Sequence, residues 1–312
     1  MTLTRLLSLA FCSGLAAGSL AGDGGLPSKW FLNAHNSYPE KDRGTDRLER
    51  ARRAGLWAVE LDLVWSEERA RTVVSHDKKL HGAEPTLEAY FFAPLAAELR
   101  QMPPGQPGLL LMLDLKTDHP GPVQELRQLL EQRRDLVTKA KRNGELEWAP
   151  LTVILSENAA AIAMFESLTP PGEPYLAMGV REPPERKFQA DVASYFPRPA
   201  TPFYRLFNFD WKHVENAKNP EAGALTTAER TRLRHIVRLA RENGYWTRAW
   251  TLNATSQEWG VGNNFGSRRT LLERWRAARD AAVDCVATDE YRLAGEFMRT
   301  AGAKPPTARS RD

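Results

Sequence analysis

The chain has 312 residues, of which 42% are hydrophobic and 26% are charged, a balance that indicates a globular rather than a disordered protein. The net charge of +4 is a mild excess that would favour an anionic substrate or a membrane surface. Its basic residues are scattered along the expected helices rather than clustered, so we expect no nucleic-acid partner.

The first residues have the form of a secretory signal. Arg5 precedes an apolar stretch over residues 6–17, and small residues stand before Gly22 at Ser19 and Ala21. We therefore expect residues 1–21 to be cleaved as a signal peptide, which makes the mature protein secreted or periplasmic. Cys12 is lost with this segment, so Cys285 cannot form an intramolecular disulfide and is expected to lie in the core.

The rest of the chain alternates between strand-like and helix-like stretches. Apolar, β-branched or aromatic runs predict strands at residues 30–34, 57–64, 109–116, 151–155, 175–180, 204–209, 245–251 and 284–288. A further run at 71–76 follows the second strand so closely that it predicts a hairpin rather than a barrel strand.

Helical periodicity fills the intervals between these runs. The clearest signal is a capping box at Thr226 and Glu229, followed by an apolar stripe that ends near Gly244. Helices are also expected over 122–137 and 156–168 and behind Ser267. Strands that alternate with helices predict right-handed βαβ units. We expect one α/β domain over residues 22–302, a (β/α)8 TIM barrel with a β-hairpin insertion after the second strand, and a disordered tail over 303–312.

The second strand carries two carboxylates, Glu60 and Asp62, at alternate positions. Side chains alternate across a strand, so both point away from the face that holds Leu61. One interpretation is an edge strand with a solvated acidic face. The other places both carboxylates inside a barrel, where buried like charges need a compensating partner such as a divalent cation.

The next barrel strand favours the interior position. Residues 109–116 read LLLMLDLK, which is too apolar for an edge strand, and they end with Asp114 and Lys116 two positions apart. Adjacent parallel strands would place Asp114 beside Glu60 and Asp62 at the carboxyl-terminal rim, where barrel enzymes keep their active sites. Three carboxylates suit Ca²⁺ or Mg²⁺ rather than zinc. Lys116 would either supply positive charge to a phosphoryl oxygen or neutralise Asp114.

Two histidines fall where a strand opens into a loop at the same rim. His35 follows the first strand, and His76 ends the hairpin run. Two imidazoles beside a cation suit phosphodiester cleavage, in which one takes a proton from the nucleophile and the other gives one to the leaving oxygen. The alternative is a pair of hydrogen-bonded histidines without a catalytic role.

The order of the motifs AHNSY, VELDLVWS, VVSHD and LMLDLK resembles the barrel phosphodiesterases that include the phosphoinositide-specific phospholipases C and the glycerophosphodiester phosphodiesterases. His35-Asn36 with Glu60-x-Asp62 is most similar to the calcium-dependent phospholipases C. Residues 114–116 are more similar to the second group, which usually carries Glu before the Lys and Arg after the first His. Segments 249–253 and 287–289 resemble the last two barrel strands of that group.

This resemblance implies a secreted, metal-dependent phosphodiesterase. Ca²⁺, or alternatively Mg²⁺, would be held by Asn36 together with the three carboxylates, while His35 and His76 share the acid and base roles and Lys116 binds the phosphate. Trp250 would form an apolar wall for an alcohol or head group, or else pack in the core. The partner would be a small phosphodiester or a phospholipid, with transient contact to a membrane surface.

Two other classes of function compete with this hypothesis. A non-catalytic protein on the same barrel would hold a metal or a phosphorylated head group without turnover, yet every member of the His and carboxylate set is present. A polysaccharide hydrolase would need two carboxylates placed about a sugar. Glu60 and Asp62 are too close on one strand for that role, and the histidines would have no use in it.

Overall fold

The computed structural model describes residues 26–39, 46–183, 198–215, 223–250, 252–254 and 263–301. The signal peptide expected at 1–21 and the tail expected at 303–312 lie outside these residues. Among the described residues, no helix combines the length and the apolar character needed to cross a membrane.

Eight parallel strands close into a barrel, which confirms the predicted (β/α)8 fold. Each strand pairs with the next around the ring, and β1 closes it by pairing with both β2 and β13. In ring order the strands are β1 (Leu32–Ala34), β2 (Ala58–Ser66), β4 (Leu109–Leu115), β7 (Leu151–Ser156), β8 (Met178–Arg181), β9 (Tyr204–Asp210), β10 (Trp246–Trp250) and β13 (Cys285–Thr288).

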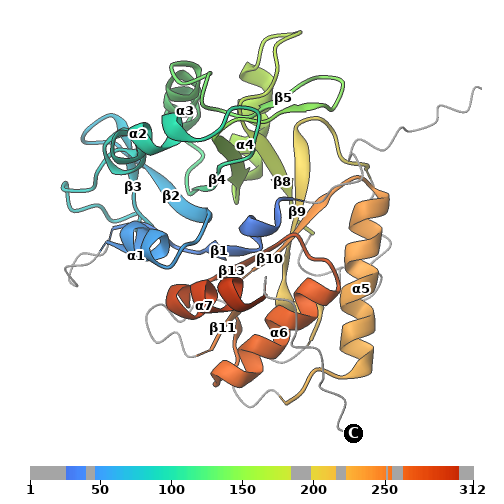
Figure 1. Ribbon diagram of the computed structural model, residues 1–312. Helices are drawn as coiled ribbons and strands as arrows, with labels where there is room; N and C mark the ends of the chain where they lie inside the picture. The colour runs from blue at the N-terminus through green and yellow to red at the C-terminus, as the bar shows by residue number, and fades with distance from the viewer. Residues whose placement is uncertain are drawn as a thin grey trace, which may run out of the picture.

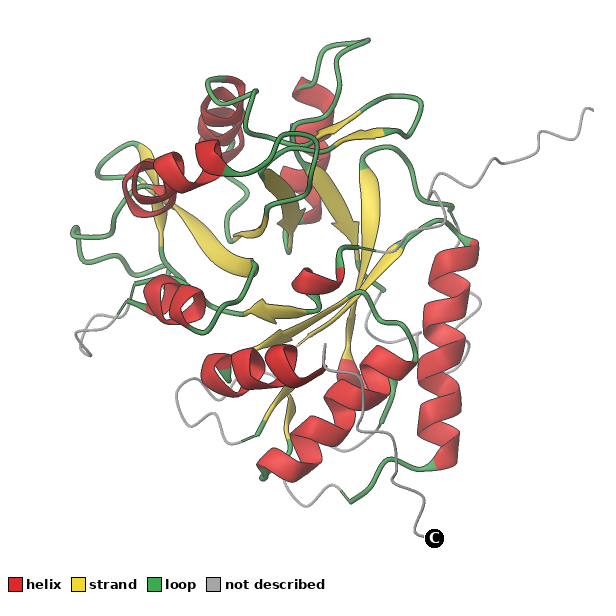
Figure 2. Cartoon of the chain, viewed as in Figure 1, coloured by secondary structure: helices red, strands yellow, loops and turns green. Residues whose placement is uncertain are grey.

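The helices lie around the outside of these strands (Figures 1 and 2). They are α1 (Arg47–Arg53), α2 (Ala93–Gln101) after the turn η2 (Glu88–Phe92), α3 (Gly121–Glu131), α4 (Ala159–Leu168), α5 (Thr227–Glu242), α6 (Arg268–Asp280) and α7 (Tyr291–Ala301). Short 3₁₀ turns stand at η1 (Ser28–Trp30) and η4 (Trp211–His213). Two small two-stranded sheets join β5 (Lys139–Ala140) to β6 (Leu146–Glu147) and β11 (Leu252–Asn253) to β12 (Asn263–Asn264).

The predicted hairpin insertion is also present. Strand β3 (Arg71–Val74) runs antiparallel to the end of β2, with Leu63 opposite Val74 and Ser66 opposite Arg71. It pairs with β2 outside the ring. The hairpin therefore extends β2 past the rim and carries the chain that follows it, including His76, back toward the carboxyl-terminal ends of the strands.

Local sequence signals set the helix ends that were predicted. Thr226 accepts from the amide of Glu229 at 3.2 Å, and the Glu229 carboxylate accepts from the amide of Thr226 at 2.8 Å, which completes the capping box. Ser267 caps α6 in the same manner, with the Thr270 amide donating to its hydroxyl at 3.2 Å.

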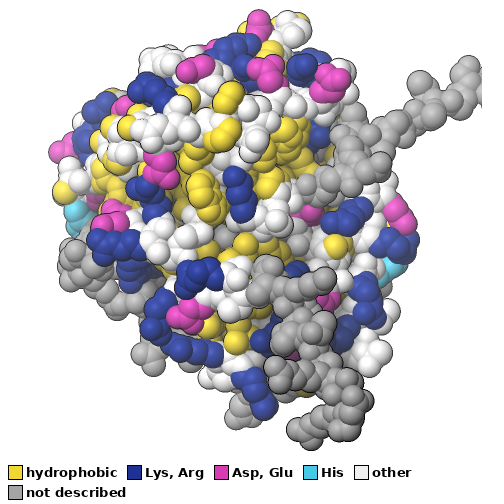
Figure 3. Space-filling view, viewed as in Figure 1, with side chains coloured by type: hydrophobic (Ala, Val, Ile, Leu, Met, Phe, Trp, Pro, Cys, Tyr) yellow, Lys and Arg dark blue, Asp and Glu magenta, His cyan; other side chains and the backbone are white. Residues whose placement is uncertain are grey.

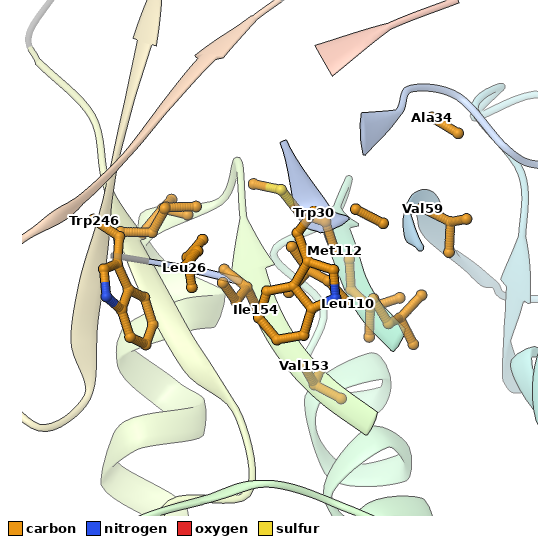
Figure 4. Packing of buried hydrophobic residues seen from close by; sticks show 14 of the residues in the cluster. Leu26, Trp30, Ala34, Val59, Leu110, Met112, Val153, Ile154 and Trp246 are labelled. Atoms are coloured by element: carbon orange, nitrogen blue, oxygen red, sulfur yellow. The ribbon is translucent and has the colours of Figure 1, made fainter. Parts of the chain in front are cut away.

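The amino-terminal end of the barrel is filled by aromatic and aliphatic side chains. Trp30, which belongs to η1 rather than to the first strand, lies near Leu110, Met112 and Ile154 (Figure 4). Its indole nitrogen donates to the carbonyl of Gly108 at 3.0 Å. This plug closes one end of the barrel, so polar inward-facing side chains gather toward the other end. Cys285 is fully buried in β13, as expected of a core residue.

Candidate active site

Three carboxylates come together inside the barrel near the carboxyl ends of β2 and β4. Asp62 and Asp114 are opposite each other in the parallel register, and Glu60 precedes Asp62 by two positions on the same face. One carboxylate oxygen from each of the three lies within 4.8 Å of the others. Because β2 pairs with β1 and β4 within the ring, the edge-strand interpretation is excluded, and the interior position of Glu60 and Asp62 is confirmed.

Asp62 is the carboxylate of this cluster whose negative charge is least compensated by its surroundings. Its side chain is 0% exposed, and neither carboxylate oxygen has a hydrogen-bond partner among the described residues. Burial, and next the charge of Asp114, raise the pKa of Asp62 well above its usual value. A buried carboxylate without hydrogen bonds is strongly unfavourable. A divalent cation that takes oxygen ligands would remove this cost, so the residues present fit such an ion.

Lys116 supplies part of the missing positive charge. Its Nζ lies 3.5 Å from Asp114 Oδ2 and 3.7 Å from Asp62 Oδ1, and it also contacts the carboxylate of Glu157. Burial disfavours the lysine charge, but Asp114 and Asp62 outweigh it and raise the pKa of Lys116 above its usual value. The geometry therefore shows the neutralising arrangement considered from the sequence, extended to two aspartates rather than one.

Glu60 is compensated differently from Asp62. Its Oε2 contacts a guanidinium nitrogen of Arg248, which reaches it from β10. The same nitrogen donates to Asn33 Oδ1 at 3.0 Å, and the other terminal nitrogen donates to Asn208 Oδ1 at 3.1 Å. Burial raises the pKa of Glu60, while Arg248 opposes that rise. Glu60 thus has one oxygen held by a fixed cation and one directed to the rest of the site.

His35 is held between two carboxylates. Its Nε2 lies 3.4 Å from Glu60 Oε1, and Nδ1 donates to the carboxylate of Asp289, with its oxygens 3.1 and 3.2 Å away. Burial disfavours the charged imidazole, but Glu60 and Asp289 outweigh burial and raise the pKa of His35. Because Nδ1 is occupied, Nε2 is the ring nitrogen that faces the carboxylate cluster.

Besides His35, two residues, Arg47 and Asn253, hold Asp289 in place through three hydrogen bonds. Arg47 donates to its Oδ1 at 2.8 Å, and the Asn253 amide donates to its Oδ2 at 2.8 Å. The backbone amide of Asp289 in turn donates to Asn253 Oδ1 at 2.8 Å. Burial opposes the ionised form, yet His35 and Arg47 lower the pKa of Asp289 below its usual value. His35 is consequently oriented by a rigid, ionised carboxylate.

His76 lies in a more open position. Its side chain is 37% exposed, and its ring packs against that of Tyr38 with centroids 5.7 Å apart. Burial, and next the positive charge of Lys116, lower the pKa of His76, and His35 acts in the same direction. His76 is thus within electrostatic reach of Lys116 and His35. The structure brings both histidines to the same rim as the carboxylates.

The two remaining predicted site residues are placed but not joined to the cluster by a measured contact. Asn36 is buried, directly follows His35 and has a left-handed backbone with φ of 55°. The next amide, of Ser37, donates to the carbonyl of Glu60 at 2.7 Å, which fastens this loop to β2. Trp250 is the half-buried last residue of β10, opposite Asp210. A metal-ligand role for Asn36 and a substrate role for Trp250 stay predictions.

Four members of the site were not predicted as such from the sequence. Asp289 follows the last barrel strand as His35 follows the first, and Arg248 is the one charged residue in the sequence WTRAW of β10, so both had a detectable signal. Asn253 ends the short strand β11 and belongs to the segment 249–253 that carries the resemblance described above, whereas Glu157 directly follows β7 and carried no signal. All four lie at the carboxyl-terminal side of the barrel interior or rim.

Comparison with known proteins found similar folds among solved structures but no matching sequence family. No protein-family model matches the chain, and none of the curated proteins does. Among solved structures, a Ca²⁺-dependent phosphatidylinositol-specific phospholipase C from Streptomyces antibioticus has a TM-score of 0.52 and 15% identity, covering 88% of this chain and 98% of that one. This resemblance shows a shared barrel fold, in agreement with the resemblance drawn from the motifs.

Two more distant barrels have lower scores. A glycerophosphoryl diester phosphodiesterase from Parabacteroides distasonis has a TM-score of 0.47 and 13% identity, over 91% of this chain and 90% of that one. An endo-β-1,4-mannanase from Cellulomonas fimi has a TM-score of 0.42 and 11% identity, over 85% of this chain and 65% of that one. Neither likeness is strong enough to choose between phosphodiesterase and glycosidase chemistry, so that choice depends on the site.

Proposed function

We propose that the chain is a metal-dependent phosphodiesterase that cleaves a glycerophosphodiester or a phospholipid head group. One observation carries the proposal: Asp62 is buried without a hydrogen bond inside a three-carboxylate cluster, and His35, fixed by Asp289, faces that cluster. The fold shared with a phosphatidylinositol-specific phospholipase C supports the same class of reaction. The signal-like residues 1–21 favour export, which would bring the enzyme to extracellular or periplasmic substrates.

Glu60, Asp62 and Asp114, with Asn36 beside them, would hold the cation. All four offer oxygen ligands, which suit Ca²⁺ and, as the alternative, Mg²⁺. When bound, such an ion neutralises charge on a non-bridging phosphate oxygen. Lys116 would remain next to Asp62 and Asp114 as a fixed positive charge for the same phosphate group.

The two histidines would divide the proton transfers. One accepts a proton from the attacking oxygen, which forms the new bond to phosphorus, while the other donates a proton to the alkoxide as its bond to phosphorus breaks. Asp289 holds the proton on Nδ1 of His35, so Nε2 is the atom that exchanges a proton with the substrate. The attacking oxygen would belong to water, or to a hydroxyl beside the phosphate, in which case the product is a cyclic phosphate.

Two features of the site disfavour a polysaccharide hydrolase. Glu60 and Asp62 lie on one strand, and Glu60 is engaged by Arg248 rather than free to act as an acid. A glycosidase of either stereochemical type places two carboxyl groups on opposite sides of the scissile bond. The paired histidines, which such a mechanism leaves unused, fit phosphodiester cleavage instead.

Phosphorus NMR on the mature protein tests this proposal. The protein would be incubated with glycerophosphodiesters, phosphatidylinositol and lysophospholipids, each with Ca²⁺, Mg²⁺ or a chelator. We expect a new phosphorus resonance that depends on the metal; a cyclic phosphate would indicate the phospholipase C type of attack, and a monoester would indicate hydrolysis. If no substrate changes with any metal and His35→Ala binds the same compounds as wild type, the chain is a binding protein on this barrel.

A further inference from the structure

A cavity lies at the end of the barrel opposite the candidate active site. It has a volume of about 710 Å³ and is lined by residues that immediately precede three barrel strands: Phe31 before β1, Trp57 before β2 and Asp284 before β13. Ala54 and Gly55, which follow α1, together with residues of α7 and of the ends of α5 and α6, complete its wall. Binding pockets for small organic ligands commonly have volumes of 300–1,000 Å³, so its size suits one small molecule.

The wall of this cavity is amphipathic. Leu26, Phe31, Val283 and Met298 give it an apolar surface, and Trp57, 36% exposed, is one of two large hydrophobic side chains exposed to that degree among the described residues. On the face shown in Figure 3, hydrophobic side chains gather near the centre with Lys and Arg side chains around them. The charged residues that line the cavity are Lys29, Arg241, Arg279, Arg299 and Asp284.

Two of the four cations that line the cavity have a carboxylate within 4 Å: Arg241 with Asp284 at 3.6 Å and Arg279 with Asp280 at 3.8 Å. Asp284 already accepts from the amides of Leu26 at 3.1 Å and Thr247 at 2.9 Å, and its one lining cation is Arg241 at 3.6 Å. Among the described residues, Arg299 donates to the Ala54 carbonyl at 3.4 Å and has no carboxylate within 4 Å.

Lys29 stands out among these cations. Its Nζ lies 4.8 Å from the centroid of the Trp57 ring. No carboxylate among the described residues lies within 4 Å of this Nζ. Burial lowers the pKa of Lys29, because the charged form loses solvent without gaining an anion. A cation over an indole ring beside an apolar wall offers an anion and a hydrocarbon chain adjacent contacts.

We propose that this cavity binds an anionic amphiphile, a single alkyl chain with a carboxylate or phosphate head, as one monomer per protein. The chain would lie against Phe31, Trp57 and Met298, and the head group would pair with Lys29 and Arg299. The site is separate from the catalytic rim, since it lies at the amino-terminal ends of β1, β2 and β13. The proposal goes beyond the phosphodiesterase function and does not depend on it.

Isothermal titration calorimetry with the mature protein tests the proposal without any turnover. The probes are dodecanoate, dodecyltrimethylammonium and inorganic phosphate, each used below its micelle concentration where it has one. We expect dodecanoate to bind at one site per chain and at least about tenfold more tightly than the cationic amphiphile or phosphate, since both halves of the ligand contribute. Absence of saturable dodecanoate binding, or equal affinity for the two amphiphiles, would overturn the proposal.

Matched variants locate the binding. Trp57→Ala is paired with Leu168→Ala, since Leu168 is 37% exposed on α4, and Arg299→Glu is paired with Arg292→Glu, an exposed position on the same helix. We expect Lys29→Glu, Trp57→Ala and Arg299→Glu each to weaken dodecanoate binding about tenfold, and the two control variants to leave it unchanged. If the controls weaken binding as much as their partners do, the amphiphile binds elsewhere and the assignment is wrong.

Discussion

Arg248 and Glu60 form an ion pair across the interior of the barrel, from β10 to β2. Both side chains are almost fully buried, and the guanidinium also reaches Asn33 and Asn208. Because of this ion pair, the two carboxylates of β2, Glu60 and Asp62, have different electrostatic surroundings. Glu60 has a permanent cationic partner, whereas the one cation within 4 Å of Asp62 among the described residues is Lys116, at 3.7 Å. The demand for a metal ion is therefore concentrated on Asp62 and its neighbour Asp114.

Removing the guanidinium should destabilise the protein strongly. Arg248→Met would leave the Glu60 carboxylate buried without its partner, a loss of about 3 kcal/mol in the free energy of unfolding. Glu60→Gln should then cost much less in the Arg248→Met background than in wild type, because the charge it removes is no longer paired. Urea denaturation of the four proteins of this double-mutant cycle measures the coupling. Additive effects would contradict the assigned ion pair.

A surface pair provides the control for this cycle. Arg238 and Glu242 on α5 are 2.6 Å apart, but their side chains are 56% and 53% exposed. Solvent screens such a pair, so Arg238→Met should change the free energy of unfolding by no more than about 0.5 kcal/mol. An equal loss in both arginine variants would mean that lost packing, rather than charge burial, explains the effect at Arg248.

Asp289 should act as a positioning residue for His35. Asp289→Asn keeps the shape of the side chain but removes the charge that supports a proton on Nδ1, so we expect kcat to fall by about a hundredfold. Metal affinity should change little, because Asp289 does not belong to the carboxylate cluster. The limb of the pH–rate profile that reports His35 should also move to lower pH, since Asp289 raises its pKa. Asp280→Asn, at an exposed helix end, is the control and should leave both readouts unchanged.

The same substitution predicts a pH dependence of stability. His35 and Arg47 outweigh burial and hold the pKa of Asp289 below its unfolded value of about 3.9. The folded state therefore binds fewer protons than the unfolded state. The stability that this carboxylate contributes is present above about pH 4 and is lost as the pH falls through its folded pKa. The difference in unfolding free energy between wild type and Asp289→Asn should thus be larger at neutral pH than in acid, and a constant difference would contradict it.

Asp62 should behave in the opposite sense when no metal is bound. Its charge is buried beside Asp114 and lacks hydrogen bonds, so Asp62→Asn should raise the melting temperature of chelator-treated protein. Added Ca²⁺ or Mg²⁺ at a hundredfold excess over Kd should stabilise wild type by about 2.7 kcal/mol and the variant far less. Differential scanning calorimetry measures both effects. A variant less stable than wild type in chelator would mean that Lys116 already compensates Asp62.

The barrel could be predicted because its strands carry their signals locally. Short apolar runs bounded by polar turns mark the eight strands, and the capping residues Thr226 and Ser267 mark two of the helices. Helix α1 was not predicted, since its sequence RLERARR is dominated by charge and has little apolar periodicity. Trp30 was assigned to the first strand because an aromatic residue suits a strand, whereas it belongs to a turn that plugs the barrel.

From the sequence, the candidate site could be predicted only for residues that lie on neighbouring barrel strands. Glu60, Asp62 and Asp114 lie on consecutive barrel strands that pair with each other, so their proximity follows from alternation and parallel pairing. The contacts of His35 with Asp289 and of Glu60 with Arg248 join residues 254 and 188 positions apart. They exist because the last strands close the ring against the first, and no local pattern specifies which side chains then meet.

The rate of phosphodiester cleavage as a function of free metal concentration, in wild type and in Asp62→Asn, tests the central claim most directly. We predict that the wild-type rate rises with Ca²⁺ or Mg²⁺ and saturates, that chelator abolishes it, and that Asp62→Asn needs at least about tenfold more metal. Cleavage that persists in chelator, or the same metal dependence in both proteins, would contradict a cation held by the carboxylates of β2 and β4.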